Sequence, residues 1–166
     1  MLIAKAGSAR ERLQALTTFL ADDLGLRGNS EEYYDPKNSL LSEVIETRLG
    51  IPISLVMLYV IVGRRAEMEI DGINLPGHFI ARYQRILFDP FHQGRILSRP
   101  DCAAILERQR LKAQSSYFAP ASPRLVLMEA SCSLQSELSP VLLDFLHLAV
   151  SDRSVLGIVV RVQPWP

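Results

Sequence analysis

Three polar residues of the types used in nucleophilic catalysis stand at expected structural boundaries. Ser54 immediately precedes eight consecutive apolar residues, 55–62. His78 follows a Pro-Gly pair, and Asp89 precedes a proline. Serine, histidine and aspartate can act together as nucleophile, general base and orienting carboxylate. The sequence therefore raises the hypothesis of acyl-transfer or hydrolytic chemistry.

The apolar run after Ser54 predicts a helix buried on all sides, from Pro52 to about residue 66. The run is too short for a membrane span, which needs about 20 residues, and proline is favoured at the first helical position. Ser54 then lies in the first turn, where unpaired N–H groups and the helix dipole favour developing negative charge. Serine is also a common helix cap, so this position alone does not separate a cap from a nucleophile.

Two short strands are expected to carry the other two residues. Residues 78–83 alternate in polarity, which predicts a strand, and a polar pair separates them from a second strand over residues 86–89. The start of one antiparallel strand lies beside the end of the next, so His78 and Asp89 should be neighbours. A hydrogen-bonded structural histidine and a turn-starting aspartate would give the same pattern.

Helical patterns flank these strands on both sides. Ser8 and Glu11 have the spacing of a capping box and open the first helix. Asp35-Pro36 opens the second, and the capping pattern Ser98–Asp101 opens the third. We expect helices over residues 9–24, 36–49 and 99–114, an edge strand over 95–97, a linker over 115–123, helices over 124–135 and 141–150, and a strand over 155–162. Helices, then strands, then helices indicate an α+β protein.

Composition places this pattern in one soluble domain. Of the 166 residues, 48% are hydrophobic, and 18 basic residues balance 18 acidic ones, so charge gives no indication of nucleic-acid or membrane partners. The two cysteines, and the lack of a secretory leader at the start of the sequence, predict a cytoplasmic location. No cofactor is predicted.

Four sequence blocks resemble the transglutaminase-like core of bacterial SirB-type proteins. They occur in order within residues 33–94 and comprise Tyr34–Ser39, Gly50–Leu55, Leu75–Phe79 and Phe88–Gly94. The resemblance implies a papain-like core in which a central buried helix packs on a small antiparallel sheet, with extra helices at both ends. It also implies a core over residues 1–114 and a C-terminal helical extension over 115–166, where the family commonly continues into tetratricopeptide-like repeats.

The resemblance places Ser54 where classical members carry a catalytic cysteine, and it matches His78 and Asp89 to the other two catalytic positions. Serine is a weaker nucleophile than a thiolate and needs both a base and a well-formed oxyanion hole. Two hypotheses follow. The chain is a regulatory or protein- and peptide-binding scaffold, or it is a serine-dependent acyl-transfer or hydrolytic enzyme with Ser54 as nucleophile, His78 as base and Asp89 as orienting group.

Three further residues are candidates for lining a pocket. The Asn38 amide could face the site as an oxyanion donor or could instead order its loop. Tyr34, or its neighbour Tyr33, could form a pocket wall. His92 could join His78 and Asp89 around a metal ion, but the spacing fits no familiar metal motif, so no metal is predicted.

Overall fold

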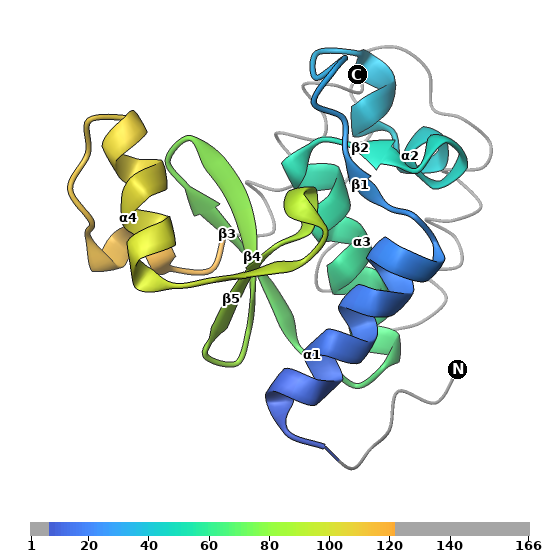
Figure 1. The fold of residues 1–166 in the computed structure, drawn as a ribbon, viewed down its shortest axis with the longest axis horizontal. Helices are drawn as coiled ribbons and strands as arrows, with labels where there is room; N and C mark the ends of the chain where they lie inside the picture. Colours follow the sequence, from blue (N-terminus) through green and yellow to red (C-terminus); the bar gives the residue numbers. More distant parts are fainter. Residues whose placement is uncertain (1–6, 122–166) are drawn as a thin grey trace, which may run out of the picture.

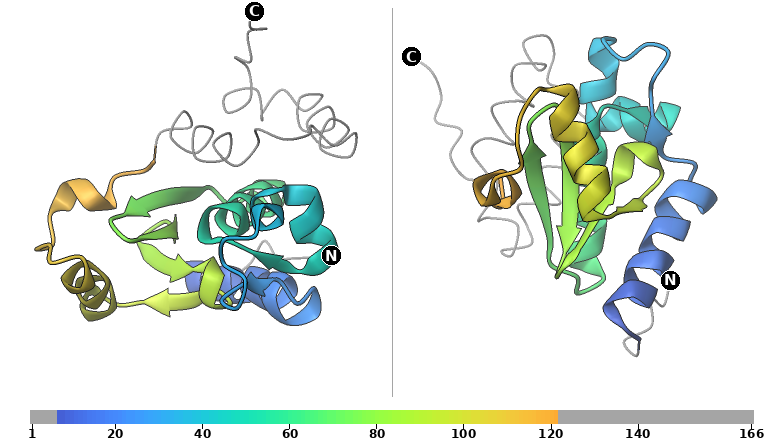
Figure 2. Two further views of the ribbon diagram at one scale, coloured as in Figure 1. Left: turned by 90° about the horizontal axis from the view of Figure 1, so that it is seen from above. Right: turned by 60° about the vertical axis from the view of Figure 1, so that its left-hand side comes forward.

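The computed structural model describes residues 7–121, which fold with three helices on one side of a sheet and one helix on the other (Figure 1). On the first side lie α1 (Ala9–Thr17), α2 (Leu41–Thr47) and α3 (Pro52–Arg65), and on the second lies α4 (Arg99–Arg108). The view from above in Figure 2 shows the sheet between these two helical layers. The α+β prediction is confirmed.

The sheet has four antiparallel strands in the order β3-β4-β5-β6. Their bounds are β3 (Ile70–Leu75), β4 (His78–Tyr83), β5 (Ile86–Asp89) and β6 (Arg95–Leu97). The last three match the prediction. Sequence reasoning missed β3, which contains an aspartate, a glycine and an asparagine, all poor strand formers. Its Gly72 is required by packing, because a Cβ there would come within 2.9 Å of the Phe79 ring.

The N-terminal helical segment begins as predicted at the capping box of Ser8 and Glu11. Its second half, η1 (Thr18–Asp23), is a π-helix. The chain leaves the helix near Gly25, whose φ is positive. The next predicted helix is wrong in detail. Asp35 caps a short 3-10 helix, η2 (Pro36–Ser39). The separate helix α2 ends at Thr47 and is followed by Arg48, whose φ is 66°.

Two short segments form a second, parallel pairing. Strand β1 (Arg27–Gly28) lies beside β2 (Leu49–Gly50). Gly50, predicted to end a helix, belongs to β2. This pairing links the N-terminal segment to the chain that enters α3.

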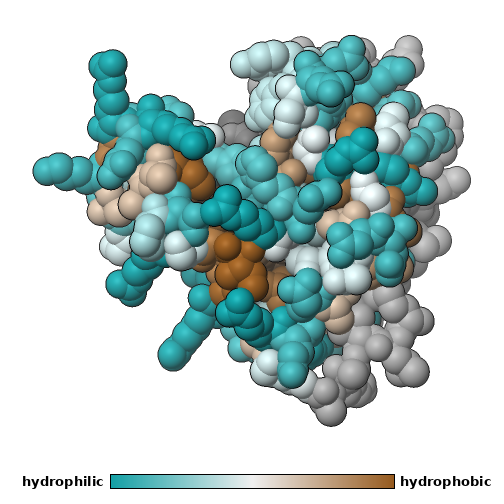
Figure 3. Space-filling model, viewed as in Figure 1, coloured by the Kyte–Doolittle hydropathy of each residue, from teal (hydrophilic) through white to brown (hydrophobic). Residues whose placement is uncertain are grey.

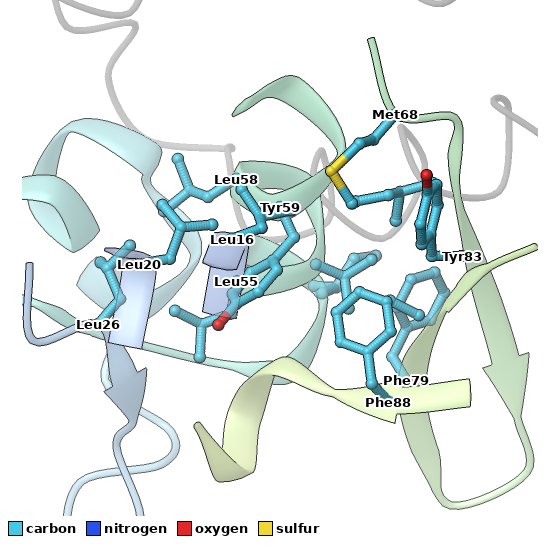
Figure 4. Close-up of a cluster of buried hydrophobic side chains, with 14 of the residues drawn as sticks. Leu16, Leu20, Leu26, Leu55, Leu58, Tyr59, Met68, Phe79, Tyr83 and Phe88 are labelled. Carbon is cyan, nitrogen blue, oxygen red and sulfur yellow. The ribbon is translucent and has the colours of Figure 1, made fainter. Parts of the chain in front are cut away.

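The main core lies between α3 and the sheet. Leu55, Val56, Leu58 and Tyr59 of α3 are buried, whereas Val60–Val62 are half-buried, so α3 is not buried on every side as predicted. Figure 4 shows Tyr59 among leucines of α1 and α3 and facing Phe88, with ring centroids 5.5 Å apart.

A second cluster covers the other face of the sheet. Ile80 of β4 packs with Cys102 and Leu106 of α4, while its neighbours Phe79 and Ala81 belong to the main core. The capping box of Ser98 and Asp101 opens α4 as predicted, but the helix ends at residue 108 and not at 114. Both faces of the sheet are therefore buried.

Residues 115–121 do not form the predicted linker. They form the 3-10 helix η4 (Ser115–Phe118) and return to the sheet, where the Ala121 N–H donates to the Gly72 carbonyl at 2.8 Å. The helices predicted over 124–135 and 141–150 and the strand over 155–162 lie outside the described residues. The domain division after residue 114 stays a prediction.

The surface in Figure 3 is mostly hydrophilic, with some hydrophobic side chains grouped near the centre of the view. Within residues 7–121, no helix combines the length and the apolar character that crossing a membrane requires.

The Tyr59 hydroxyl is buried and has no hydrogen-bond partner among the described residues. Burial, with a smaller contribution from the charge of Asp22, raises its pKa far above the usual value, so the group stays neutral. Because Tyr59→Phe removes an unsatisfied polar atom, we expect unchanged stability or a gain of up to about 1 kcal/mol in urea unfolding. A loss above about 1 kcal/mol would contradict this explanation.

Candidate functional site

Asp89 organises the candidate site from the end of β5. The residue is only 3% exposed. Its Oδ1 accepts hydrogen bonds from the backbone N–H groups of Phe91 at 3.0 Å and His92 at 3.4 Å, and so caps the 3-10 helix η3 (Pro90–His92). These bonds fix the rotation of the carboxylate, so its second oxygen has a defined direction.

Two histidines converge on that second oxygen. His78 Nε2 and His92 Nδ1 each lie 2.7 Å from Asp89 Oδ2. His78 is the first residue of β4, and the tight β4–β5 hairpin brings it beside the end of β5, as the sequence predicted. The His92 side chain is 61% exposed and that of His78 is 14% exposed, so the cluster reaches solvent through His92.

The pKa of Asp89 reflects these neighbours. Burial raises the pKa, but hydrogen bonds and charge from His78, and then from His92, lower it by more, and the net value lies below the usual 3.8. The carboxylate is therefore ionised at neutral pH and can accept from both rings.

An aromatic side chain that sequence reasoning missed packs against both histidines. The Phe91 ring lies edge-on to His78 at 6.0 Å and to His92 at 5.2 Å. Its other neighbours are Tyr33, at 6.0 Å, and the backbone of Gly28, where a Cβ would come within 2.5 Å of the ring. The Phe-His pair after Asp-Pro is a signal that could have placed Phe91 at this site.

Ser54 is in the first turn of α3, as predicted, but its hydroxyl binds backbone groups. Its Oγ lies 2.7 Å from the Asn38 carbonyl and 3.0 Å from the Ile51 carbonyl, and it accepts the Ile51 N–H at 3.1 Å. The residue is 1% exposed. Among the described residues, the hydrogen bonds of Ser54 do not include one to His78.

Asn38 and Tyr34 do not face the histidines as the pocket predictions would require. The buried Asn38 amide donates to the carbonyls of Glu32 at 2.6 Å and Tyr33 at 3.2 Å, and its oxygen accepts from Asn29 at 3.0 Å, so it orders the loop. Tyr34 is 93% exposed and contacts the ring of Tyr33 edge-on. Of the pocket candidates, only His92 joins His78 and Asp89.

With this geometry established, comparison with known proteins places the chain in a family. The model of the transglutaminase-like superfamily matches residues 2–130. The chain belongs to this superfamily.

Relatives of this transglutaminase-like domain include bacterial and animal proteins. It is 36% identical to a UPF0162 protein of Xylella fastidiosa over 138 residues and 32% identical to one of Pseudomonas aeruginosa over 133 residues. These alignments cover 75% and 77% of the chain and 48% of each relative, so the chain spans about half their length. It is also 30% identical to F-box only protein 21 of Mus musculus over 106 residues, covering 57% of the chain and 17% of that protein.

No solved structure matches the chain significantly. The family findings confirm the transglutaminase-like core. The SirB-type assignment, and the placement of Ser54 at the position of a catalytic cysteine, stay predictions.

The transglutaminase-like domain also has a pocket of about 530 Å³ away from these residues. Its lining includes Arg82 and Arg85 near the far end of β4, and Arg99 and Cys102 of α4. Arg82 is paired with Asp71 at 2.7 Å, so part of this positive charge is already neutralised. The sequence-predicted site residues do not line this pocket.

Proposed function

We propose that this transglutaminase-like domain is a binding or regulatory module without acyl-transfer chemistry, and that Ser54 has a structural role. The observation that carries the proposal is the 2.7 Å hydrogen bond from Ser54 Oγ to the Asn38 carbonyl. A hydroxyl has one proton to donate, and a general base must accept that proton for a serine to attack. The Ser54 hydroxyl already donates its proton to the backbone carbonyl of Asn38.

Packing around the hydroxyl supports the same proposal. A Cβ built at Gly50 would lie 2.8 Å from Ser54 Oγ and 3.1 Å from both Val44 and Leu55. The space beside the hydroxyl is therefore already filled. A substrate carbonyl would have to enter this space beside a side chain that is 1% exposed. The hydroxyl instead satisfies the Ile51 N–H at the start of α3, as one half of a capping box does.

Exposed aromatic residues near the histidines favour a protein or peptide partner. Tyr33 is 41% exposed and Tyr34 is 93% exposed, and Tyr33 connects through Phe91 to His78 and His92. Tyrosine combines a large apolar ring with a polar hydroxyl and is enriched at protein interfaces. We also propose a cytoplasmic location, which agrees with the free thiol of Cys102.

A serine-dependent acyl-transfer or hydrolytic enzyme is the alternative. One observation favours it: His78 and Asp89 form the base and orienting pair that such an enzyme needs, with 2.7 Å between Nε2 and Oδ2. In this alternative, Ser54 must leave the Asn38 carbonyl and turn toward His78 before it reacts.

Labelling with a fluorophosphonate probe separates the two proposals. The binding-module proposal predicts no modification of Ser54 in the folded protein, because the hydroxyl is buried and its proton is held by a carbonyl. Mass spectrometry locates any adduct, and a known serine hydrolase shows that the probe is active. An adduct on Ser54 that disappears in His78→Ala, with that variant folded by circular dichroism, would establish the enzyme instead.

A further inference from the structure

We propose that His78, Asp89 and His92 form a binding site for a divalent transition-metal ion such as Zn²⁺. The ligand atoms would be His78 Nε2, Asp89 Oδ2 and His92 Nδ1, which all lie within 4.8 Å of one another. The sequence predicted no metal because the spacing matches no familiar motif. The site arises from a hairpin end and a 3-10 turn, a combination that such motifs do not describe. It does not depend on the role of Ser54.

The distances suit a metal site once the two imidazoles turn toward a shared ion. Zinc binds histidine nitrogen and carboxylate oxygen at about 2.0–2.2 Å, so ligand atoms around it lie about 2.9–3.4 Å apart. Both histidine nitrogens are 2.7 Å from the carboxylate oxygen. The three ligand atoms lie within 4.8 Å of one another, so the two imidazoles must turn toward a shared ion, and His92 is exposed enough to move.

The carboxylate is already oriented for this role. Asp89 Oδ1 is held by the N–H groups of Phe91 and His92, which leaves Oδ2 directed between the two rings. In metal sites, hydrogen bonds to the non-coordinating atoms of the ligand side chains fix the geometry of the ligands. Phe91 also packs edge-on against both imidazoles.

The ligand set indicates the class of ion. Imidazole favours zinc, iron, nickel and copper, whereas calcium and magnesium prefer oxygen ligands alone. Two histidines and one carboxylate leave a fourth tetrahedral position, which is typical of sites that bind water or a substrate group. Because one carboxylate offsets only half the charge of Zn²⁺, that position should favour an anion such as a partner's carboxylate.

Zinc binding is tested on the untagged, chelator-treated full chain by calorimetry and by NMR of the histidine ring protons. The chain has three histidines, so His147 serves as an internal reference. We expect one ion per chain, with shifts in His78 and His92 but not His147. His92→Ala should weaken binding at least about tenfold, since losing even an outer partner of a ligand costs about 10–100-fold. His147→Ala should bind as the wild type does.

Three results would overturn the proposal. These are the absence of saturable zinc binding, binding that shifts His147 in place of His78 and His92, and equal affinity in the wild type and a folded His92→Ala. Because the His92 side chain is 61% exposed, we expect His92→Ala to fold, and the NMR result on the wild type needs no variant. A fluorophosphonate adduct on Ser54 would reject the binding-module proposal and leave these readouts unchanged.

Discussion

Asp89→Ala is expected to destabilise the domain by about 3–5 kcal/mol, because it leaves four donors without their acceptor. Two are backbone N–H groups, of Phe91 and His92, and two are the rings of His78 and His92. The residue is almost fully buried, so water cannot readily replace the lost partner. Urea unfolding, in the presence of a chelator, measures the difference in the free energy of unfolding.

Asp89→Asn is the matched variant. Its side-chain carbonyl can still cap η3, so we expect a smaller loss of about 1–3 kcal/mol. If Asp89→Asn is as stable as the wild type, the negative charge of Asp89 makes no contribution to stability, and the role assigned to the two histidine contacts is wrong. Equal losses in the two variants would instead show that the cap of η3 contributes nothing.

The wild type and Asp89→Asn together also test how the stability of the domain depends on pH. The folded pKa of Asp89 lies below the usual 3.8, so the unfolded chain binds more protons in acid. The stability that the wild type gains from this carboxylate is therefore complete above about pH 4 and is lost as pH falls through the folded pKa. Asp89→Asn should show a shallower decline over this range, measured again with chelator present.

Gly94→Ala is expected to destabilise the domain by about 2–5 kcal/mol, from backbone strain and a steric clash together. The φ of Gly94 is 73°, and a Cβ there would lie 2.4 Å from Thr17 Cγ2 and 3.2 Å from the Tyr59 hydroxyl oxygen. The Gly94 N–H also donates to the Asp89 carbonyl at 2.8 Å, so the strain reaches the candidate site.

Gly25→Ala separates the two contributions. Its φ is 75°, almost that of Gly94, but a Cβ at Gly25 would meet nothing within 4 Å. We therefore expect a loss of only about 1–2 kcal/mol, from strain alone. Thr17→Ser in the Gly94→Ala background removes the methyl group nearest the clash and should recover part of the difference. Equal losses for the two glycine variants would show that packing against Thr17 has no effect.

Local rules predicted the elements that carry His78 and Asp89. Alternating polarity and a short connection are enough to define a hairpin, and its antiparallel pairing brings residues eleven apart in the sequence together. Proline followed by a long apolar run likewise predicted α3, whose bounds are Pro52–Arg65. The four blocks of sequence within residues 33–94 predicted the superfamily, which the family match confirmed.

Long-range contacts decided the parts that the sequence left open. Strand β3 forms despite polar residues because Gly72 fits under the Phe79 ring and the whole strand pairs with β4. Residues 115–121 looked like a linker, yet Ala121 hydrogen-bonds to β3. Neither contact has a local signal, because each depends on a partner more than five residues away.

The sequence by itself determined that Ser54 opens a buried helix and that His78 and Asp89 meet at a hairpin. Only the tertiary structure decided which groups these side chains hydrogen-bond. Ser54 donates to a carbonyl sixteen residues earlier in the chain, and His92 turns back on the carboxylate that caps its own 3-10 helix. A hydroxyl and an imidazole bind whichever group the fold brings within about 3 Å, and residue type alone does not specify that group.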